Sequence, residues 1–269
     1  MQRLDGWLAE ERETFADRTD KLARGVPENV GPYRATTAAL GEKVAAGLLA
    51  IEADSDGARR RFDAASNLHA GAADAGTNVV AERYFALRAA TLAGAKQAVP
   101  GLARQLLRAV EHATLPDLDE RGALDIDYYR ALAAGAGGDA ETVAEATDRL
   151  AAETTRLTRQ GFFETTGREE RRLYGGRVAF LEGVLDGDPA AVGRGIEGVL
   201  AHHDGGVAGT ATDLPCREAT FLATVATAAG LDADLPESDA LMTPLVDATA
   251  LPDGLSPTQS LSARPASDG

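Results

Sequence analysis

Apolar residues recur at helical spacing along most of the chain, with polar residues between them. Between residues 4 and 23, for example, Leu8, Phe15 and Leu22 lie seven residues apart, which gathers them on one face of a helix. No β-branched segment alternates with polar residues over the length of a strand. The pattern therefore predicts helices over 4–23, 31–51, 78–98, 102–112 and 214–229, and another after a turn at 54–57.

Two segments of the second half share one pattern. A helical stretch is followed by Gly138-Asp139 and a further helical stretch, and 49 residues later the same order recurs around Gly187-Asp188. Glycine favours the left-handed end of a helix and aspartate favours the N-cap of the next, so each segment predicts a helical hairpin. The turn at 54–57 is a more diverged copy. Hairpins of this kind bury their apolar stripes by stacking, which predicts an all-α fold of stacked antiparallel helical hairpins, either a tetratricopeptide-like solenoid or an irregular bundle.

The order of these elements favours a single helical domain over residues 1–255. A polar loop at 115–124 is the alternative boundary between two halves. Residues 256–269 are rich in serine and proline, and we expect a tail of this composition to be disordered.

The chain is strongly acidic, with 42 acidic residues against 27 basic ones and a formal net charge of −15 at pH 7. A field of this sign repels phosphate backbones and anionic lipids, so neither nucleic acid nor a membrane is an expected partner. Only three of the basic residues are lysines and alanine is abundant, which favours a halophilic protein adapted to high salt. A compatible alternative is an acidic face that meets a basic protein partner.

Several sequence features that would indicate export, membrane insertion or cofactor binding are absent. No segment approaches the roughly 20 apolar residues of a membrane span, and no apolar signal-peptide core follows the start, so we expect a cytoplasmic protein. Cys216 is the one cysteine, which excludes a disulfide scaffold and a zinc site with paired cysteines. No phosphate-binding glycine loop and no metal-ligating histidine pair is present, so no cofactor and no metal are expected.

Two short motifs are candidates for contact with a partner. Residues 125–129 place Tyr128 and Tyr129 at a predicted helix start, and tyrosines supply rigid, amphipathic contact area. His202 and His203 end another predicted helix, where adjacent side chains point about 100° apart. The alternatives are one tyrosine in the core with the other over a seam, and histidines that complement the negative end of a helix. These four residues form the predicted partner-binding set.

No catalytic residue is assigned. The sequence shows no nucleophile paired with a base, no paired-carboxylate motif and no cofactor fingerprint. Cys216 stands at a predicted helix start, where the helix dipole lowers a thiol pKa, yet no histidine lies near it in the sequence. A non-enzymatic protein-binding module is therefore favoured. The rival is a helical enzyme whose site is assembled from distant residues, which would show a closed pocket with convergent ionisable groups.

Three segments resemble the immunity 49 family, helical proteins associated with polymorphic toxin systems. The first is the helix start Asp125-Ile126-Asp127-Tyr128-Tyr129, and the second is the helix end Glu197-Gly198-Val199-Leu200-Ala201-His202-His203. The third runs from Phe221-Leu222-Ala223 through Asp234-Leu235-Pro236 to Met242-Thr243-Pro244-Leu245. After His203 the chain departs from the family, since Asp204-Gly205-Gly206 stands in place of an aromatic-rich stretch.

The resemblance implies a non-enzymatic protein that binds and neutralises a cognate toxin inside the producing cell. An acidic surface suits a basic toxin domain such as a nuclease, through steering and charge complementarity. The alternative among binding proteins is a tetratricopeptide-like scaffold for a different partner. Such a scaffold would show a concave groove lined by side chains from successive hairpins.

Overall fold

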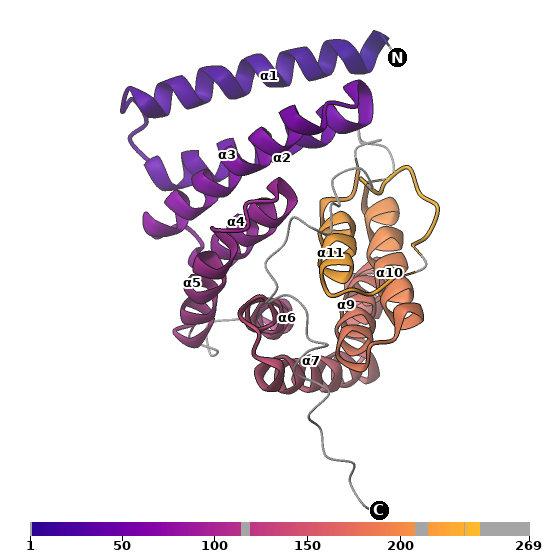
Figure 1. Ribbon diagram of the computed structural model, residues 1–269. Coiled ribbons are helices and arrows are strands. Elements are labelled where there is room, and N and C mark those ends of the chain that lie inside the picture. The colour runs from indigo at the N-terminus through magenta and orange to yellow at the C-terminus, as the bar shows by residue number, and fades with distance from the viewer. Residues whose placement is uncertain (1, 114–118, 208–214, 234, 243–269) are drawn as a thin grey trace, which may run out of the picture.

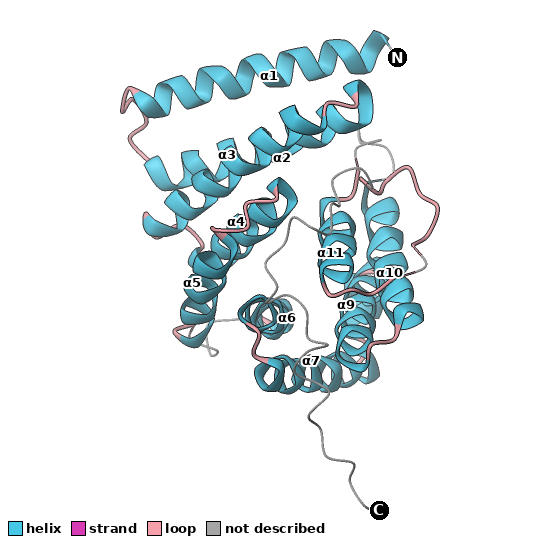
Figure 2. Cartoon of the chain, in the orientation of Figure 1, coloured by secondary structure: helices cyan, strands magenta, loops and turns pink. Residues whose placement is uncertain are grey.

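The computed structural model describes residues 2–113, 119–207, 215–233 and 235–242, and within these ranges the chain forms eleven helices and no strand (Figure 1, Figure 2). The predicted all-α fold is confirmed. The predicted disordered tail, 256–269, lies outside the described residues. In the part that the structure describes, no helix is both long enough and apolar enough to cross a bilayer.

Consecutive helices pack side by side in chain order, as stacked hairpins do. The helices are α1 (Gln2–Ala23), α2 (Val30–Glu52), α3 (Ser55–Asp74), α4 (Val79–Ala93), α5 (Val99–Glu111), α6 (Glu120–Gly137), α7 (Ala140–Arg159), α8 (Phe162–Thr166), α9 (Arg168–Asp186), α10 (Pro189–Val207) and α11 (Arg217–Ala228). From α1 to α10, each helix contacts the next one along the chain, and α7 also contacts α9 across the short α8.

The stack curves, and its last helix returns to the first half of the chain. In Figure 1, α1 to α5 lie on one side, α6 and α7 lie at the bend, and α9 and α10 lie on the other side. α11 contacts both α10 and α4. One cluster of buried apolar residues extends through the stack from Leu8 to Met242. The return of α11 therefore joins the two arms of the curve.

The turns within the hairpins have the predicted chemistry. Gly138 follows α6 with a left-handed φ of 79°, and the Asp139 carboxylate accepts a hydrogen bond from the Thr142 N–H at 3.1 Å. In the second copy, Gly187 has a φ of 66° and Asp188 directly precedes α10. Both repeated segments are therefore helix–turn–helix hairpins.

The diverged turn between α2 and α3 has the same geometry without a glycine. Ala53 lies in the left-handed region with φ 52° and ψ 27°, and the Asp54 carboxylate accepts a hydrogen bond from the Gly57 N–H at 2.8 Å. A Cβ is disfavoured in this region by roughly 1–2 kcal/mol. We expect Ala53→Gly to raise the free energy of unfolding by about 0.5–1 kcal/mol, because the relieved strain exceeds the freedom that glycine adds to the unfolded chain.

Urea titration of paired variants measures this effect. Gly138→Ala is the reciprocal change, because it adds a Cβ at a residue with a φ of 79° and should lower the stability. A loss of stability in Ala53→Gly would contradict the assignment of strain to this turn.

Two predicted helix boundaries in the first half of the chain are wrong. The helix predicted over 78–98 ends at Ala93, because Gly94 adopts the left-handed conformation and its N–H bonds back to carbonyls of α4. The following helix begins at Val99 rather than at residue 102. Pro100 fits within its first turn, where a missing N–H leaves no hydrogen bond unmade.

The polar loop predicted at 115–124 is partly helical. The Asp119 carboxylate accepts a hydrogen bond from the Gly122 N–H at 2.8 Å and caps α6, which begins at Glu120. Residues 114–118 lie outside the described part of the chain. α5 and α6, which precede and follow this segment in the sequence, pack against each other.

α9 and α10 cross so closely that their backbones are in direct contact. A Cβ on Gly176 would lie 2.7 Å from the carbonyl oxygen of Gly195, and a Cβ on Gly195 would lie 2.6 Å from the backbone nitrogen of Phe180. Glycine at both positions lets the helices cross with no side chain between them. Since Arg177 directly follows Gly176, this crossing helps to set the position from which the Arg177 side chain enters the interior.

Candidate functional site

Glu218, in the first turn of α11, is the centre of a buried network of charged and phenolic groups. Its Oε1 accepts a hydrogen bond from the Tyr128 hydroxyl at 2.7 Å, and Arg177 Nη2 lies 3.4 Å from the same oxygen. Its Oε2 accepts a hydrogen bond from the Tyr84 hydroxyl, and Arg88 Nη1 lies 3.4 Å away. This one carboxylate therefore connects α11 to α4, α6 and α9.

Glu42, on α2, is a second buried carboxylate. Its Oε2 accepts hydrogen bonds from Arg88 Nη2 and Arg217 Nη1, each at 2.7 Å. Its Oε1 has no hydrogen-bond partner among the described residues and lies 3.8 Å from His69 Nε2. His69 Nδ1 lies 2.6 Å from Glu82. Since Arg88 contacts both buried glutamates, the two carboxylates belong to one network.

Asp125, on α6, extends the network toward α9. It accepts hydrogen bonds from Arg177 Nη1 at 2.7 Å and from the Tyr174 hydroxyl at 3.2 Å. The guanidinium carbon of Arg177 also lies 4.1 Å from the centre of the Tyr128 ring, within cation–π range. Arg177 is thus held by two carboxylates and an aromatic face.

The arginines keep both buried glutamates ionised. Burial alone would raise their pKa values, but neighbouring charges outweigh burial and lower both. The charges of Arg177 and Arg88 lower the pKa of Glu218. Those of Arg88 and Arg217 lower the pKa of Glu42. Each carboxylate is therefore charged across the neutral range.

The phenols of the network stay protonated. Burial, followed by the charge of Glu218, raises the pKa of Tyr84 and of Tyr128 well above the ordinary value of 10. None of these shifts moves a group toward pH 7, where a general acid or base would have to titrate. At neutral pH, Glu42 and Glu218 therefore offer fixed negative charges, and Tyr84 and Tyr128 offer hydrogen-bond donors.

Stability should fall in acid in a way that depends on Glu218. A carboxyl with a lower pKa in the folded than in the unfolded chain stabilises the fold above its ordinary pKa of 4.5, and this contribution is lost as the pH falls through the folded value. Between roughly pH 5 and pH 3, we expect the free energy of unfolding of the wild type to decrease more steeply than that of Glu218→Gln, which has no carboxyl to protonate. Urea titrations across this range measure both slopes. Parallel slopes would show that Glu218 does not contribute to the acid sensitivity.

A cleft of about 840 Å³ lies beside the network. Residues of α1, α2, α4, α9, α10 and the start of α11 line it, so its walls come from both arms of the curve. Arg88, Arg177 and Glu218 are both members of the network and lining residues of the cleft. The buried charges are therefore within reach of a molecule that enters the cleft.

The structure divides the four predicted contact residues into two pairs. His202 and His203, near the end of α10, line the cleft, and His202 Nδ1 is buried without a hydrogen-bond partner in the described structure. Tyr128 and Tyr129 are 0% and 7% exposed, so the structure places both in the interior, and their contact with a partner stays a prediction. Burial of Tyr128 is favourable because its hydroxyl has the Glu218 carboxylate as an acceptor.

The sequence patterns did not single out the charged residues at the centre of the site, which are Glu42, Arg88, Arg177 and Glu218. One pattern could have indicated them, namely a charged residue at helical spacing between apolar residues of the same helix face. Arg177, for example, lies three residues after Tyr174 and three residues before Phe180, both of which are buried. At this helical spacing the charged side chain must also point inward.

Cys216 is a structural cap and has an unreactive thiol. Its Sγ accepts a hydrogen bond from the Ala219 N–H at 3.5 Å at the start of α11. Burial raises the pKa of the thiol from 9.0 to about 11. At neutral pH Cys216 therefore lacks the thiolate that a nucleophile requires.

Alkylation tests the state of Cys216. At about pH 8, we expect iodoacetamide to modify the folded protein at least on the order of 100-fold more slowly than the chain unfolded in guanidinium chloride, because the raised pKa and burial both suppress the reactive thiolate. Mass spectrometry of quenched samples gives both rates. Similar rates in the two states would mean that the thiol is exposed and ionised in the folded protein.

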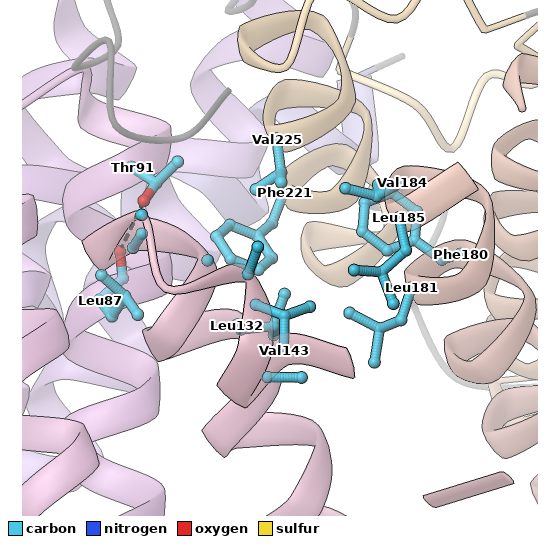
Figure 3. A pocket seen from close by; sticks show the side chains of 15 residues that line it. Leu87, Thr91, Leu132, Val143, Phe180, Leu181, Val184, Leu185, Phe221 and Val225 are labelled. Carbon is cyan, nitrogen blue, oxygen red and sulfur yellow. Dashed lines mark hydrogen bonds between the residues drawn. The ribbon is translucent and has the colours of Figure 1, made fainter. Parts of the chain in front are cut away.

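A second, apolar pocket lies between α4, α6, α7, α9 and α11 (Figure 3). It holds about 40 Å³, and side chains such as Leu132, Phe180 and Val225 form its walls. Among the described lining residues Thr91 has the one polar side chain, and its hydroxyl donates to the carbonyl oxygen of Leu87. With no ionisable lining residue and little room, this pocket is a packing gap of the core.

No family model, curated protein or solved structure matches the chain. In the ranges that the structure describes, no three His, Cys, Asp or Glu side chains are arranged to hold a metal ion. Any assignment of function therefore depends on the cleft, the network beside it and the charge of the chain.

Proposed function

We propose that the protein is a non-enzymatic protein-binding module that acts as an immunity protein of the immunity 49 type and neutralises a cognate toxin. The observation that carries the proposal is the cleft of about 840 Å³, lined by helices from both arms of the stack. Concave surfaces of stacked helical hairpins are the usual binding faces of such folds. The cleft therefore supports capture of a part of another protein.

The carboxylates and phenols of the site support a binding role rather than a role in acid–base catalysis. The lowered pKa values of Glu42 and Glu218 keep both groups ionised, and the raised pKa values of Tyr84 and Tyr128 keep the phenols neutral. General acid–base catalysis needs a group whose pKa lies near the working pH. Cys216, with a thiol pKa of about 11, is equally unsuited to nucleophilic catalysis at neutral pH.

A basic toxin domain is the partner that best fits the charge of the chain. The net charge of −15 attracts a basic protein over long range, which raises the association rate and favours that partner over acidic ones. The same field disfavours nucleic acid and anionic membranes. In this role the protein acts in the cytoplasm of the cell that makes the toxin.

Co-expression tests the proposal. The open reading frames beside the gene are searched for a modular protein with a variable C-terminal domain, and that domain is expressed with and without the full chain. We expect growth only when the chain is present, and we expect the two proteins to co-purify in salt that matches the native cytoplasm. An unrelated acidic helical protein is the control and should give no rescue. Absence of both rescue and a co-purifying basic protein would reject the proposal.

A tetratricopeptide-like scaffold is the second candidate function. It is supported by the stacked hairpins and by the position of the cleft between the two arms of the curve. A scaffold would co-purify with a partner from native cells yet give no rescue from any neighbouring toxin domain. The same pair of measurements therefore separates the two functions.

A further inference from the structure

We infer that the cleft recognises a carboxylate-bearing segment of the partner protein, namely an acidic loop or chain end with apolar residues beside its carboxylates. The inference rests on the proposed binding function and adds the chemistry of the contact. The whole chain carries a net charge of −15, yet among the described residues that line the cleft five are cations and one is a carboxylate, Glu218. The five cations are Arg18, Lys43, Arg88, Arg177 and Arg217.

Two of the three carboxylates that pair with the inner cations lie behind them. The third, Glu218, pairs with Arg88 and Arg177 and lines the cleft. Glu42 pairs with Arg88 and Arg217, is 1% exposed, and does not line the cleft. Asp125, which pairs with Arg177, does not line it either. A molecule in the cleft therefore meets mainly guanidinium and ammonium groups, although each inner arginine has a counter-charge.

Three cations keep donors for a ligand. The side chains of Lys43 and Arg217 are 41% and 35% exposed. Lys43 Nζ donates to Glu11 at 3.0 Å, and Arg217 has one described hydrogen bond, from Nη1 to Glu42. Arg18 has no carboxylate within ion-pair distance in the described structure, and its Nη1 donates to the Thr36 hydroxyl at 3.2 Å. A guanidinium carries five N–H donors in a planar fork, which matches the two oxygens of a carboxylate.

Apolar lining residues favour an organic carboxylate over a bare inorganic anion. Leu40, Leu173 and Val199 line the same cleft as the cations. A volume of about 840 Å³ exceeds what a single carboxylate group fills and accommodates several side chains. An acidic segment with apolar neighbours uses both kinds of lining residue, since its carboxylates face the arginines and its apolar side chains face the leucines and valine.

The charge of the whole chain selects a protein segment over a nucleic acid. A polynucleotide would bring a dense row of phosphates into the field of a chain with a net charge of −15. A basic protein that exposes one short acidic segment avoids this repulsion. The acidic exterior attracts the body of such a partner, and the cleft then binds the segment of opposite sign, which gives the complex a defined orientation.

Peptide binding to the full-length protein tests the inference. The probe is a fluorescein-labelled, capped peptide that alternates glutamate and leucine, and the comparison peptide carries glutamine in place of glutamate. The cleft variant is Arg18→Gln/Lys43→Gln. The matched control is Arg104→Gln/Arg108→Gln, which makes the same charge change at two exposed residues of α5, outside the cleft. Circular dichroism confirms that both double variants fold.

We expect the glutamate peptide to bind at least about tenfold more tightly than the glutamine peptide, with an affinity that falls as the salt concentration rises. The cleft variant should lose about tenfold in affinity for the glutamate peptide, and the control variant less than about twofold. Equal binding of the two peptides, or equal losses in the two double variants, would overturn the inference. Displacement of the peptide by inorganic phosphate as readily as by unlabelled peptide would also overturn it, since the site would then be a small-anion site.

Binding of the co-purified partner to the wild type and to the cleft variant distinguishes failure of this inference from failure of the proposed function. If the partner binds wild type and cleft variant equally, the carboxylate-recognition inference fails while the binding function stands. If no partner or rescue is found, yet the peptides behave as expected, the proposed function fails while the chemistry of the cleft stands.

Discussion

Replacement of Glu218 by alanine is expected to lower the free energy of unfolding by about 3–5 kcal/mol. The carboxylate faces Arg88 and Arg177, which are 8% and 7% exposed. Its removal takes one of two counter-charges from each arginine and the acceptor from the hydroxyls of Tyr84 and Tyr128. Groups that stay largely buried after they lose a partner regain little water, so much of the cost of their burial remains. Thermal unfolding should show a midpoint lower by roughly 6–20 °C.

Two further variants make this result specific to the network. Glu13→Ala removes an exposed carboxylate from α1 and should change the stability by less than about 0.5 kcal/mol. Glu218→Gln keeps an acceptor of similar shape but loses the charge, so its stability should lie between those of the wild type and Glu218→Ala. A Glu218→Ala variant as stable as Glu13→Ala would refute the assignment of Glu218 as the centre of the network.

Alanine at two adjacent glycines of α9 should have opposite effects. A Cβ on Gly176 would lie 2.7 Å from the carbonyl oxygen of Gly195 and 3.1 Å from the backbone nitrogen of Val199, so α9 and α10 would have to move apart. We expect Gly176→Ala to lower the free energy of unfolding by about 2–3 kcal/mol, because a backbone has no rotamer with which to accommodate the methyl group. Urea titration followed by circular dichroism gives the value.

Gly175→Ala is the matched control on the same helix. Gly175 is exposed, and a Cβ there meets nothing within 4 Å. Alanine is the better helix former by about 0.8–1 kcal/mol, so this variant should be more stable than the wild type. Destabilisation of similar size in both variants would mean that the close crossing of α9 and α10 is not the cause.

Local structure could be predicted from the sequence because its causes are local. Gly138-Asp139 and Gly187-Asp188 carry the preferences that end one helix and cap the next, and the structure contains both turns. The predicted end of α4 is wrong because two local preferences compete at this point of the chain. Alanines continue the helical pattern as far as Ala98, but the left-handed conformation of Gly94 ends the helix first.

The candidate site could not be predicted because its partners are distant in the chain. Glu42 lies 46 residues before Arg88, and Arg88 lies 130 residues before Glu218. The residues around each charge indicate burial through helical spacing, but they do not indicate which opposite charge lies across the interior. The placement of Tyr128 depends on the same information, since a tyrosine suits a surface or a core until an acceptor for its hydroxyl is known.

The return of α11 to the first half of the chain has a consequence for folding order. Contacts between α2 and α3 join residues that are close in sequence, so they can form while later helices are still being synthesised. Glu42 and Arg88 meet their partners on α11 only after residue 218 has left the ribosome. Interactions that form after the transition state slow unfolding more than they accelerate folding. We therefore expect loss of the α11 contacts to accelerate unfolding more than it slows folding, and loss of contacts within the earlier hairpins to slow folding.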